Sequence, residues 1–213
     1  PFSFRAGNRS PSSGQNPAPH RRRGRYNTAM SAEIFLIAPT DQPIEQLVAA
    51  LNVTLDRDEV AALLLPRGNL AENAYKELAK RIVPLAQAKG AAVLIEGEPG
   101  LVRLVGADGL HVPGGIKAVE EAIAALKPRM IVGAGDIHSR DDAMLKGEAG
   151  VDYILFGPLS GSISAPEREM AQWWAETMEI PSVLSDPEAG PASYDAGDCE
   201  FIGLPLTVAE PTK

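Results

Sequence analysis

The sequence predicts an α/β fold, a compact (β/α)8 TIM barrel with a weak or missing seventh helix. Three observations support this prediction. From residue 33 onward, short aliphatic runs alternate with amphipathic stretches, which is typical of a parallel sheet with helices packed outside it. The aliphatic runs are almost continuously apolar, as strands covered on both faces are. The chain of 213 residues is long enough for one domain of this kind.

The expected strands are eight short aliphatic runs. They cover residues 34–38, 61–65, 91–96, 109–112, 130–134, 153–156, 182–184 and 201–204. An open doubly wound sheet is the alternative arrangement. Residues 37–40, after the first run, lack the G-x-G-x-x-G pattern that opens a dinucleotide-binding fold, so the barrel is favoured.

The expected helices are five amphipathic stretches between these runs. They cover residues 44–51, 71–88, 116–126, 139–148 and 167–178. Ser139, followed by Asp141 and Asp142, indicates an N-cap with acidic residues in the first turn, which complements the helix dipole. Two crossovers are weak. The third crossover, residues 100–107, is short. Residues 185–200 carry prolines and glycines where the seventh helix should lie, so a loop is expected there.

Composition and charge disfavour several classes of function. A formal net charge of -8 and a pI near 5.0 argue against a nucleic-acid partner, because an acidic surface repels phosphate backbones. No apolar run is long enough to cross a bilayer, so no membrane association is expected. Cys199 is the only cysteine and no zinc-type cluster is present, so a reducing compartment, the cytoplasm, fits best. A small-molecule partner is favoured.

Residues 1–29 differ in composition from the rest of the chain. They are rich in Pro, Ser, Gly, Asn and Arg and poor in aliphatic residues, so they cannot bury enough apolar surface to fold. We expect a disordered N-terminal extension at 1–29 and the barrel domain at 30–213, with Met30 as a natural start. The alternative is a basic arm for nucleic acid or an acidic surface.

Three short motifs carry a resemblance to a known family. Residues 106–112 read Gly-Ala-Asp-Gly-Leu-His-Val, residues 138–143 read His-Ser-Arg-Asp-Asp-Ala, and residues 150–158 read Gly-Val-Asp-Tyr-Ile-Leu-Phe-Gly-Pro. In order, spacing and strand position they resemble motifs of the thiamine phosphate synthase and thiazole tautomerase family. The resemblance implies a (β/α)8 barrel and a role in thiamine biosynthesis.

The chemistry that the resemblance implies joins a pyrimidine pyrophosphate to a thiazole phosphate and releases pyrophosphate with Mg²⁺. Several family positions differ in this chain. The Asn-Asp pair after the third strand is Glu96-Gly97, the second metal carboxylate is missing from residues 113–116, and the lysine after the sixth strand is Ala165. A diphosphate leaving group needs cations to stabilise its charge, so these losses weaken the case for the standard synthase reaction.

Carboxylates at the carboxyl ends of the predicted strands are candidate metal ligands. Glu96, Asp136 and Asp186 follow the third, fifth and seventh strands, at the mouth where barrel active sites are built. Carboxylate oxygens suit Mg²⁺, so these residues could form a rearranged acidic site. The alternative is that they are solvated loop residues.

His138 is the candidate catalytic residue, with Asp136 beside it in the sequence. The resemblance places His138 where the tautomerase branch has a histidine after the fifth strand, and an imidazole can exchange a proton near neutral pH. An exposed histidine in a helix-starting loop is the alternative. His111, inside the fourth strand, is interpreted as structural.

Candidate phosphate and substrate contacts follow the second, sixth and eighth strands. They are Arg67, Gly157, Ser160, Ser162, Ser164 and Gly203. Arg67 is what remains of the family's basic run after the second strand. The small residues, hydroxyls and backbone donors of residues 157–164 suit a phosphate, and barrels often bind phosphate near their last two strands. A plain flexible loop is the alternative.

The sequence leaves three hypotheses of function. The first is a thiamine phosphate synthase-like protein that acts on or binds a thiazole phosphate or a pyrimidine pyrophosphate, as a divergent synthase or as a tautomerase that uses His138. The second is a catalytically degenerate barrel that still binds a phosphorylated ligand. The third, least favoured, is a nucleic-acid binder built on the basic arm. Adjacent Trp173 and Trp174 point in different directions on their helix, so one is a candidate contact in a homo-oligomer.

Overall fold

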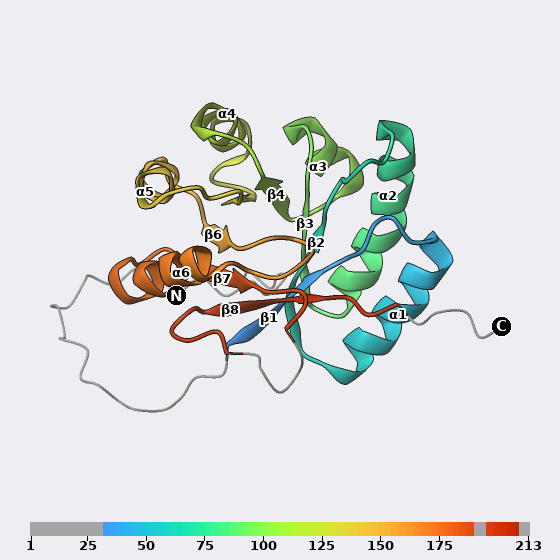
Figure 1. The fold of residues 1–213 in the computed structure, drawn as a ribbon. Helices are drawn as coiled ribbons and strands as arrows, with labels where there is room; N and C mark the ends of the chain where they lie inside the picture. The colour runs from blue at the N-terminus through green and yellow to red at the C-terminus, as the bar shows by residue number, and fades with distance from the viewer. Residues whose placement is uncertain (1–31, 190–194, 209–213) are drawn as a thin grey trace, which may run out of the picture.

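A closed barrel of parallel strands forms the centre of the molecule (Figure 1). The computed structural model describes residues 32–189 and 195–208. The extension expected at residues 1–29 lies outside these ranges. Each strand pairs in parallel with its neighbour in the sequence, and β8 closes the barrel against β1. The predicted fold class is confirmed.

The strands agree with the predicted runs to within one residue at each end. They are β1 (Glu33–Ile37), β2 (Val60–Leu65), β3 (Ala92–Ile95), β4 (Gly109–Val112), β5 (Ile131–Ala134), β6 (Tyr153–Phe156), β7 (Ser182–Ser185) and β8 (Phe201–Pro205). The helices that cover them are α1 (Ile44–Arg57), α2 (Glu72–Ala88), α3 (Pro99–Val105), α4 (Ile116–Leu126), α5 (Arg140–Glu148) and α6 (Ala165–Thr177).

Two helices differ in an informative way from the sequence pattern. Helix α1 runs six residues beyond its predicted end at residue 51, because Leu47, Leu51 and Leu55 continue the apolar stripe at intervals of four residues. The short third crossover contains α3, which has only seven residues and ends at Gly106 with a positive φ of 75°. No helix lies between β7 and β8 in the part of that connection that the structure describes, as predicted.

Successive side chains of the strands divide the apolar residues into two layers. One set, including Phe35, Leu64 and Tyr153, fills the interior of the barrel, and the other packs between the strands and the helices. The Tyr153 ring lies 5.4 Å from the ring of Phe35. A Cβ atom at Gly133 would lie 2.0 Å from the Tyr153 ring, so only glycine leaves room for this tyrosine.

Two aspartates, one before β4 and one before β6, each bind the amino end of the preceding strand in the barrel. Asp108 accepts a hydrogen bond from the backbone N–H of Val93 (2.7 Å), and Asp152 accepts one from Val132 (2.9 Å). Both carboxylates therefore satisfy strand-end donors at the face opposite the loops that follow the strands. The carboxyl ends of the strands all meet at the other face, which is where a barrel site is expected.

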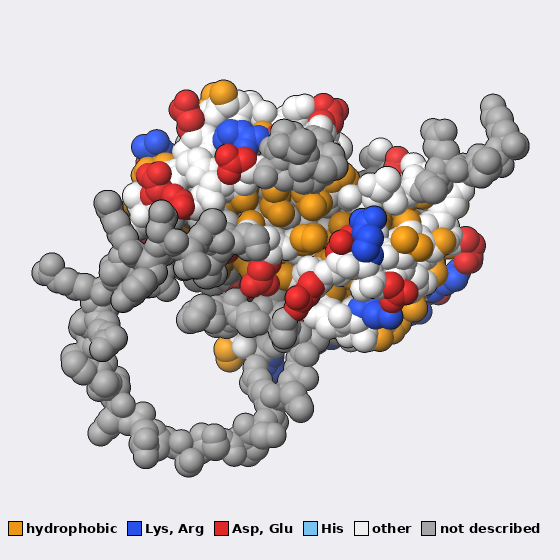
Figure 2. All heavy atoms as spheres, turned by 90° about the horizontal axis from the view of Figure 1, so that it is seen from below, with side chains coloured by type: hydrophobic (Ala, Val, Ile, Leu, Met, Phe, Trp, Pro, Cys, Tyr) orange, Lys and Arg blue, Asp and Glu red, His pale blue; other side chains and the backbone are white. Residues whose placement is uncertain are grey.

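Charged side chains of both signs lie on the surface of the described residues. No helix among them is long and apolar enough to cross a membrane. Figure 2 shows acidic and basic side chains interspersed around apolar ones on one face, without a continuous basic patch there. The two tryptophans of α6 do point in different directions. Trp174 is buried, whereas Trp173 is partly exposed and lies 4.7 Å from the guanidinium carbon of Arg140.

Candidate active site

The loop between β5 and α5 brings the two candidate catalytic residues together. His138 Nε2 lies 3.3 Å from Asp136 Oδ2, and both side chains are exposed, His138 to 76%. Asp136 has a φ of 53°, a left-handed conformation that aspartate tolerates better than most residues. Buried Ile137 anchors the loop between them. An exposed imidazole held beside a carboxylate is suited to exchanging a proton with a ligand.

A buried lysine, which the sequence analysis missed, holds this loop from behind. Lys146 on α5 is 1% exposed and donates to the carbonyl oxygens of Gly135 (3.0 Å) and Asp136 (3.2 Å). It also pairs with Asp142 Oδ2 at 3.0 Å. Asp142 and Lys146 are four residues apart on one helix, a spacing that is usual for exposed pairs. The spacing in the sequence therefore allows the pair to be predicted, but it does not show that Lys146 is buried.

Glu96, the candidate metal ligand after β3, is largely buried and already has a protein partner. Its Oε2 accepts a hydrogen bond from the backbone N–H of Arg67 at 2.8 Å. Burial raises the pKa of the Glu96 carboxyl, and the Arg67 N–H lowers it by less. The side chain of Arg67 donates to the carbonyl of Leu70 in its own loop (3.4 Å). These contacts tie the ends of β2 and β3 together at the mouth.

His111 has a structural environment, as the sequence interpretation expected. Its Nδ1 lies 2.8 Å from the hydroxyl of Tyr153, and its Nε2 would lie 2.6 Å from a Cβ atom at Gly135. Burial, together with the charge of Lys146, lowers the pKa of His111 to about 4. The imidazole is therefore neutral at physiological pH and packs inside the barrel.

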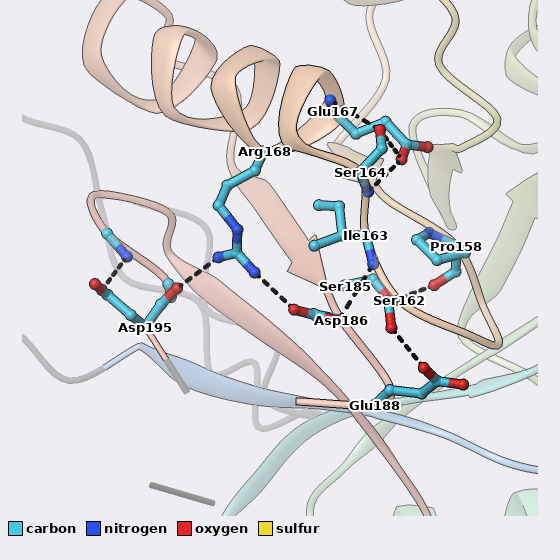
Figure 3. A network of polar contacts seen from close by, with 12 residues as sticks. Pro158, Ser162, Ile163, Ser164, Glu167, Arg168, Ser185, Asp186, Glu188 and Asp195 are labelled. Atoms are coloured by element: carbon cyan, nitrogen blue, oxygen red, sulfur yellow. Dashed lines mark hydrogen bonds and ion pairs between the residues drawn. The ribbon is translucent and has the colours of Figure 1, made fainter. Parts of the chain in front are cut away.

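The loop between β6 and α6 is held by carboxylates that follow β7 (Figure 3). Ser162 Oγ donates to Glu188 Oε2 at 2.5 Å, and the Ile163 N–H donates to Asp186 Oδ1 at 3.2 Å. Arg168 Nη2 pairs with Asp186 Oδ2 at 2.6 Å. The hydroxyl and N–H that were expected to receive a phosphate are thus bound by acidic side chains in this structure.

Two of the remaining candidate phosphate contacts are serines near the start of α6, and two are glycines beside β7. Ser164 is the N-cap of α6 and forms a capping box with Glu167, while Ser160 is exposed in the same loop. Gly157 has a φ of 93°, and a Cβ atom there would lie 2.2 Å from the carbonyl oxygen of Ser185. A Cβ atom at Gly203 would lie 3.0 Å from Ser185 as well. Both glycines therefore allow close approach of backbones beside β7.

The candidate metal ligands do not form one site. Among residues 32–189 and 195–208, no group of three or more His, Cys, Asp or Glu side chains is placed to hold a metal ion. Glu96 accepts from a backbone N–H, Asp186 pairs with Arg168, and Asp136 pairs with His138. The donor set does not fit a magnesium site made of these three carboxylates, so no step of the chemistry is assigned to a protein-bound metal.

Comparison with known sequences identifies relatives over most of the barrel. A family profile described as Thiamine monophosphate synthase matches residues 34–185. The thiamine-phosphate synthase of Rhodospirillum centenum is 30% identical over 179 residues, which cover 80% of this chain and 86% of that protein. The thiamine-phosphate synthase of Hyphomonas neptunium is 34% identical over 161 residues, which cover 70% and 72% of the two chains.

Solved structures with the same architecture are more distant in sequence. Thiamine phosphate pyrophosphorylase from Pyrococcus furiosus superimposes with a TM-score of 0.65 at 18% identity, covering 81% of this chain and 85% of that chain. KGPDC from Streptococcus mutans gives a TM-score of 0.61 at 10% identity, with 82% and 88% covered. These likenesses show the fold alone. On the match to the family profile and the sequence relatives, the chain belongs to the thiamine monophosphate synthase family.

Proposed function

We propose that this thiamine-phosphate synthase-like protein binds a thiazole phosphate at the mouth of its barrel and that His138, paired with Asp136, transfers a proton to or from that ligand. The observation that carries the proposal is the pair itself, with 3.3 Å between His138 Nε2 and Asp136 Oδ2. A carboxylate beside an imidazole orients the ring and stabilises its protonated form. Proton transfer at this pair requires no cation from the protein.

The phosphate of the ligand would contact the loop between β6 and α6. Ser162 and the Ile163 N–H supply donors, and Gly157 and Gly203 keep the adjacent backbone free of side chains. Arg67 and Ser160 are further candidate contacts at the same face. The Ser162 hydroxyl donates a hydrogen bond to the Glu188 carboxylate. A phosphate bound to Ser162 must therefore replace Glu188 as the acceptor.

Replacing Glu188 by glutamine is therefore expected to tighten phosphate binding. A carboxylate about 4 Å from a phosphate repels it by on the order of 1 kcal/mol in a solvated site, so an affinity gain of about fivefold is expected. Calorimetry with thiazole phosphate measures it. Glu169→Gln, which removes the same charge from an exposed position on α6, is the control and should leave the affinity unchanged. Equal affinities of Glu188→Gln and wild type would show that this loop does not bind the phosphate.

The second candidate function is the coupling reaction for which the sequence relatives are named. It is favoured by the family relationship over residues 34–185. It would require Mg²⁺ delivered with the diphosphate, since the carboxylates within residues 32–189 and 195–208 form no site for the ion by themselves. Dependence on Mg²⁺ thus separates the two candidate reactions.

The setting of the protein follows from the same proposal. We infer a cytoplasmic location and a small phosphorylated molecule as partner, with no role in binding nucleic acid, in keeping with the net charge of -8. Cys199 is buried and burial raises the pKa of its thiol to about 11, which suits an unreactive cysteine in a reducing compartment. Partly exposed Trp173 remains the candidate contact in a homo-oligomer.

A thermal-shift titration of the full chain tests the proposal. Thiazole phosphate, thiamine phosphate and pyrophosphate are each added with and without Mg²⁺, because a ligand of the folded state raises the melting temperature. We expect thiazole phosphate to stabilise the protein without Mg²⁺. Stabilisation by pyrophosphate only with Mg²⁺ would favour the coupling reaction instead. No shift with any of the three compounds would reject the site.

A further inference from the structure

Lys146 is buried to an extent that is rare for a lysine. It is 1% exposed, and its ammonium makes contacts with Gly135 O, Asp136 O and Asp142 Oδ2 at 3.0, 3.2 and 3.0 Å. An ammonium has three N–H donors, and each has a partner within the protein. An apolar side chain of similar length would fill the same space. Lysine differs from it at this position by its positive charge and its three N–H donors.

Two of the three partners, the carbonyls of Gly135 and Asp136, belong to the loop that carries the His138–Asp136 pair. The third, Asp142, binds that loop from α5. The two carbonyls flank Asp136 in consecutive peptide groups. The Asp142 carboxylate that pairs with Lys146 also accepts the backbone N–H of His138 at 3.3 Å. One buried ammonium therefore fixes the backbone on both sides of Asp136 and, through Asp142, at His138.

The contacts also determine how the loop peptides are oriented. The C=O and N–H of a trans peptide point in opposite directions. Since the carbonyls of Gly135 and Asp136 point at Lys146, the N–H groups of Asp136 and Ile137 point away from it. Asp136 keeps its left-handed φ of 53° in this arrangement, a conformation that is costly for a residue with a side chain.

We propose that Lys146 is the positioning residue of the His138–Asp136 pair: its ammonium fixes the two peptides that place the Asp136 carboxylate against the imidazole. The inference rests on the proposed function for its kinetic consequence only. Because Lys146 is buried behind the loop that carries the pair, we expect its removal to act on the rate of proton transfer and not on ligand affinity.

Replacing Lys146 by methionine in the full chain tests this role. The affinity for thiazole phosphate is expected to stay within about twofold of wild type, while the rate of proton exchange falls about tenfold or more, because small misplacements of a reacting group are costly. The matched control is Lys117→Met, at an exposed position on α4, which should change neither quantity. A folded Lys146→Met protein with the wild-type rate, or with rate and affinity lowered together, would overturn the proposal.

A second readout does not depend on the proposed reaction. The contact between the His138 ring and the Asp136 side chain is followed by NOEs between their carbon-bound hydrogens in wild type, Lys146→Met and Lys117→Met. Loss of this contact in Lys146→Met, with the contact kept in Lys117→Met, supports positioning even if no ligand binds, and an unchanged contact in Lys146→Met contradicts it. If Lys146→Met does not fold, Asp142→Asn removes one partner of the same ammonium and is expected to weaken the contact by a smaller amount.

Discussion

Replacing Gly157 by alanine is expected to destabilise the protein by about 3 kcal/mol or more. The φ of 93° at this residue costs an alanine roughly 1–2 kcal/mol. The new Cβ would also lie 2.2 Å from the carbonyl oxygen of Ser185, a backbone atom that no rotamer change can move away. The ends of β6 and β7 must separate to relieve this contact. The hydrogen bond from Ser185 Oγ to Pro158 O, at 2.6 Å, would be lost with it.

Gly161 offers a matched control in the same loop. It also has a positive φ, of 86°, but a Cβ atom there meets nothing within 4 Å. Gly161→Ala should therefore lose only the conformational term of about 1–2 kcal/mol. Urea denaturation of both variants measures the difference. If Gly157→Ala were no less stable than Gly161→Ala, the close approach of the two strand ends would not contribute to stability.

Replacing His138 by alanine is expected to lower the rate of proton exchange by about 10²- to 10⁴-fold, the range over which a general base usually contributes. The imidazole is 76% exposed, so neither the fold nor the melting temperature should change appreciably. The measurement is the exchange of a carbon-bound ring hydrogen of thiazole phosphate with solvent deuterium, followed by NMR. Ligand affinity is determined in parallel by calorimetry.

The result distinguishes the hypotheses that the sequence left open. Asp141→Asn, in the first turn of α5 but outside the pair, is the control and should keep the wild-type rate. A wild-type rate in His138→Ala would leave the tautomerase hypothesis without its base. Binding of thiazole phosphate by a wild-type protein that shows no exchange would instead indicate the catalytically degenerate barrel.

The fold could be predicted because its determinants are local. Aliphatic runs such as residues 61–65 and 153–156 identify strands directly, and the Ser139 hydroxyl does accept the Asp142 N–H at 3.1 Å as an N-cap. The end of α1 was missed because Asn52, Val53 and Thr54 are polar or β-branched residues that favour helices weakly, although Leu55 continues the apolar stripe.

The candidate site was predictable only in part, because its contacts join distant segments. His138 and Asp136 are neighbours in one loop, so their association follows from the sequence. The pairing of Asp186 with Arg168 links residues 18 apart, and the contact of Ser162 with Glu188 spans 26 residues. The position of these carboxylates in the sequence predicted that they lie at the mouth of the barrel. It did not predict that each of them would already be bound to another side chain of the protein.

The space left by Gly133 has a consequence for how this barrel can diverge. The Tyr153 ring occupies the volume that a side chain at Gly133 would need, and its hydroxyl lies 2.8 Å from His111, whose ring in turn lies where a side chain at Gly135 would extend. A larger residue at either glycine requires a smaller one on the adjacent strand at the same time. Substitutions at these four positions should therefore appear together among homologues, as compensated sets, and the interior of the barrel can drift in sequence only by coordinated steps.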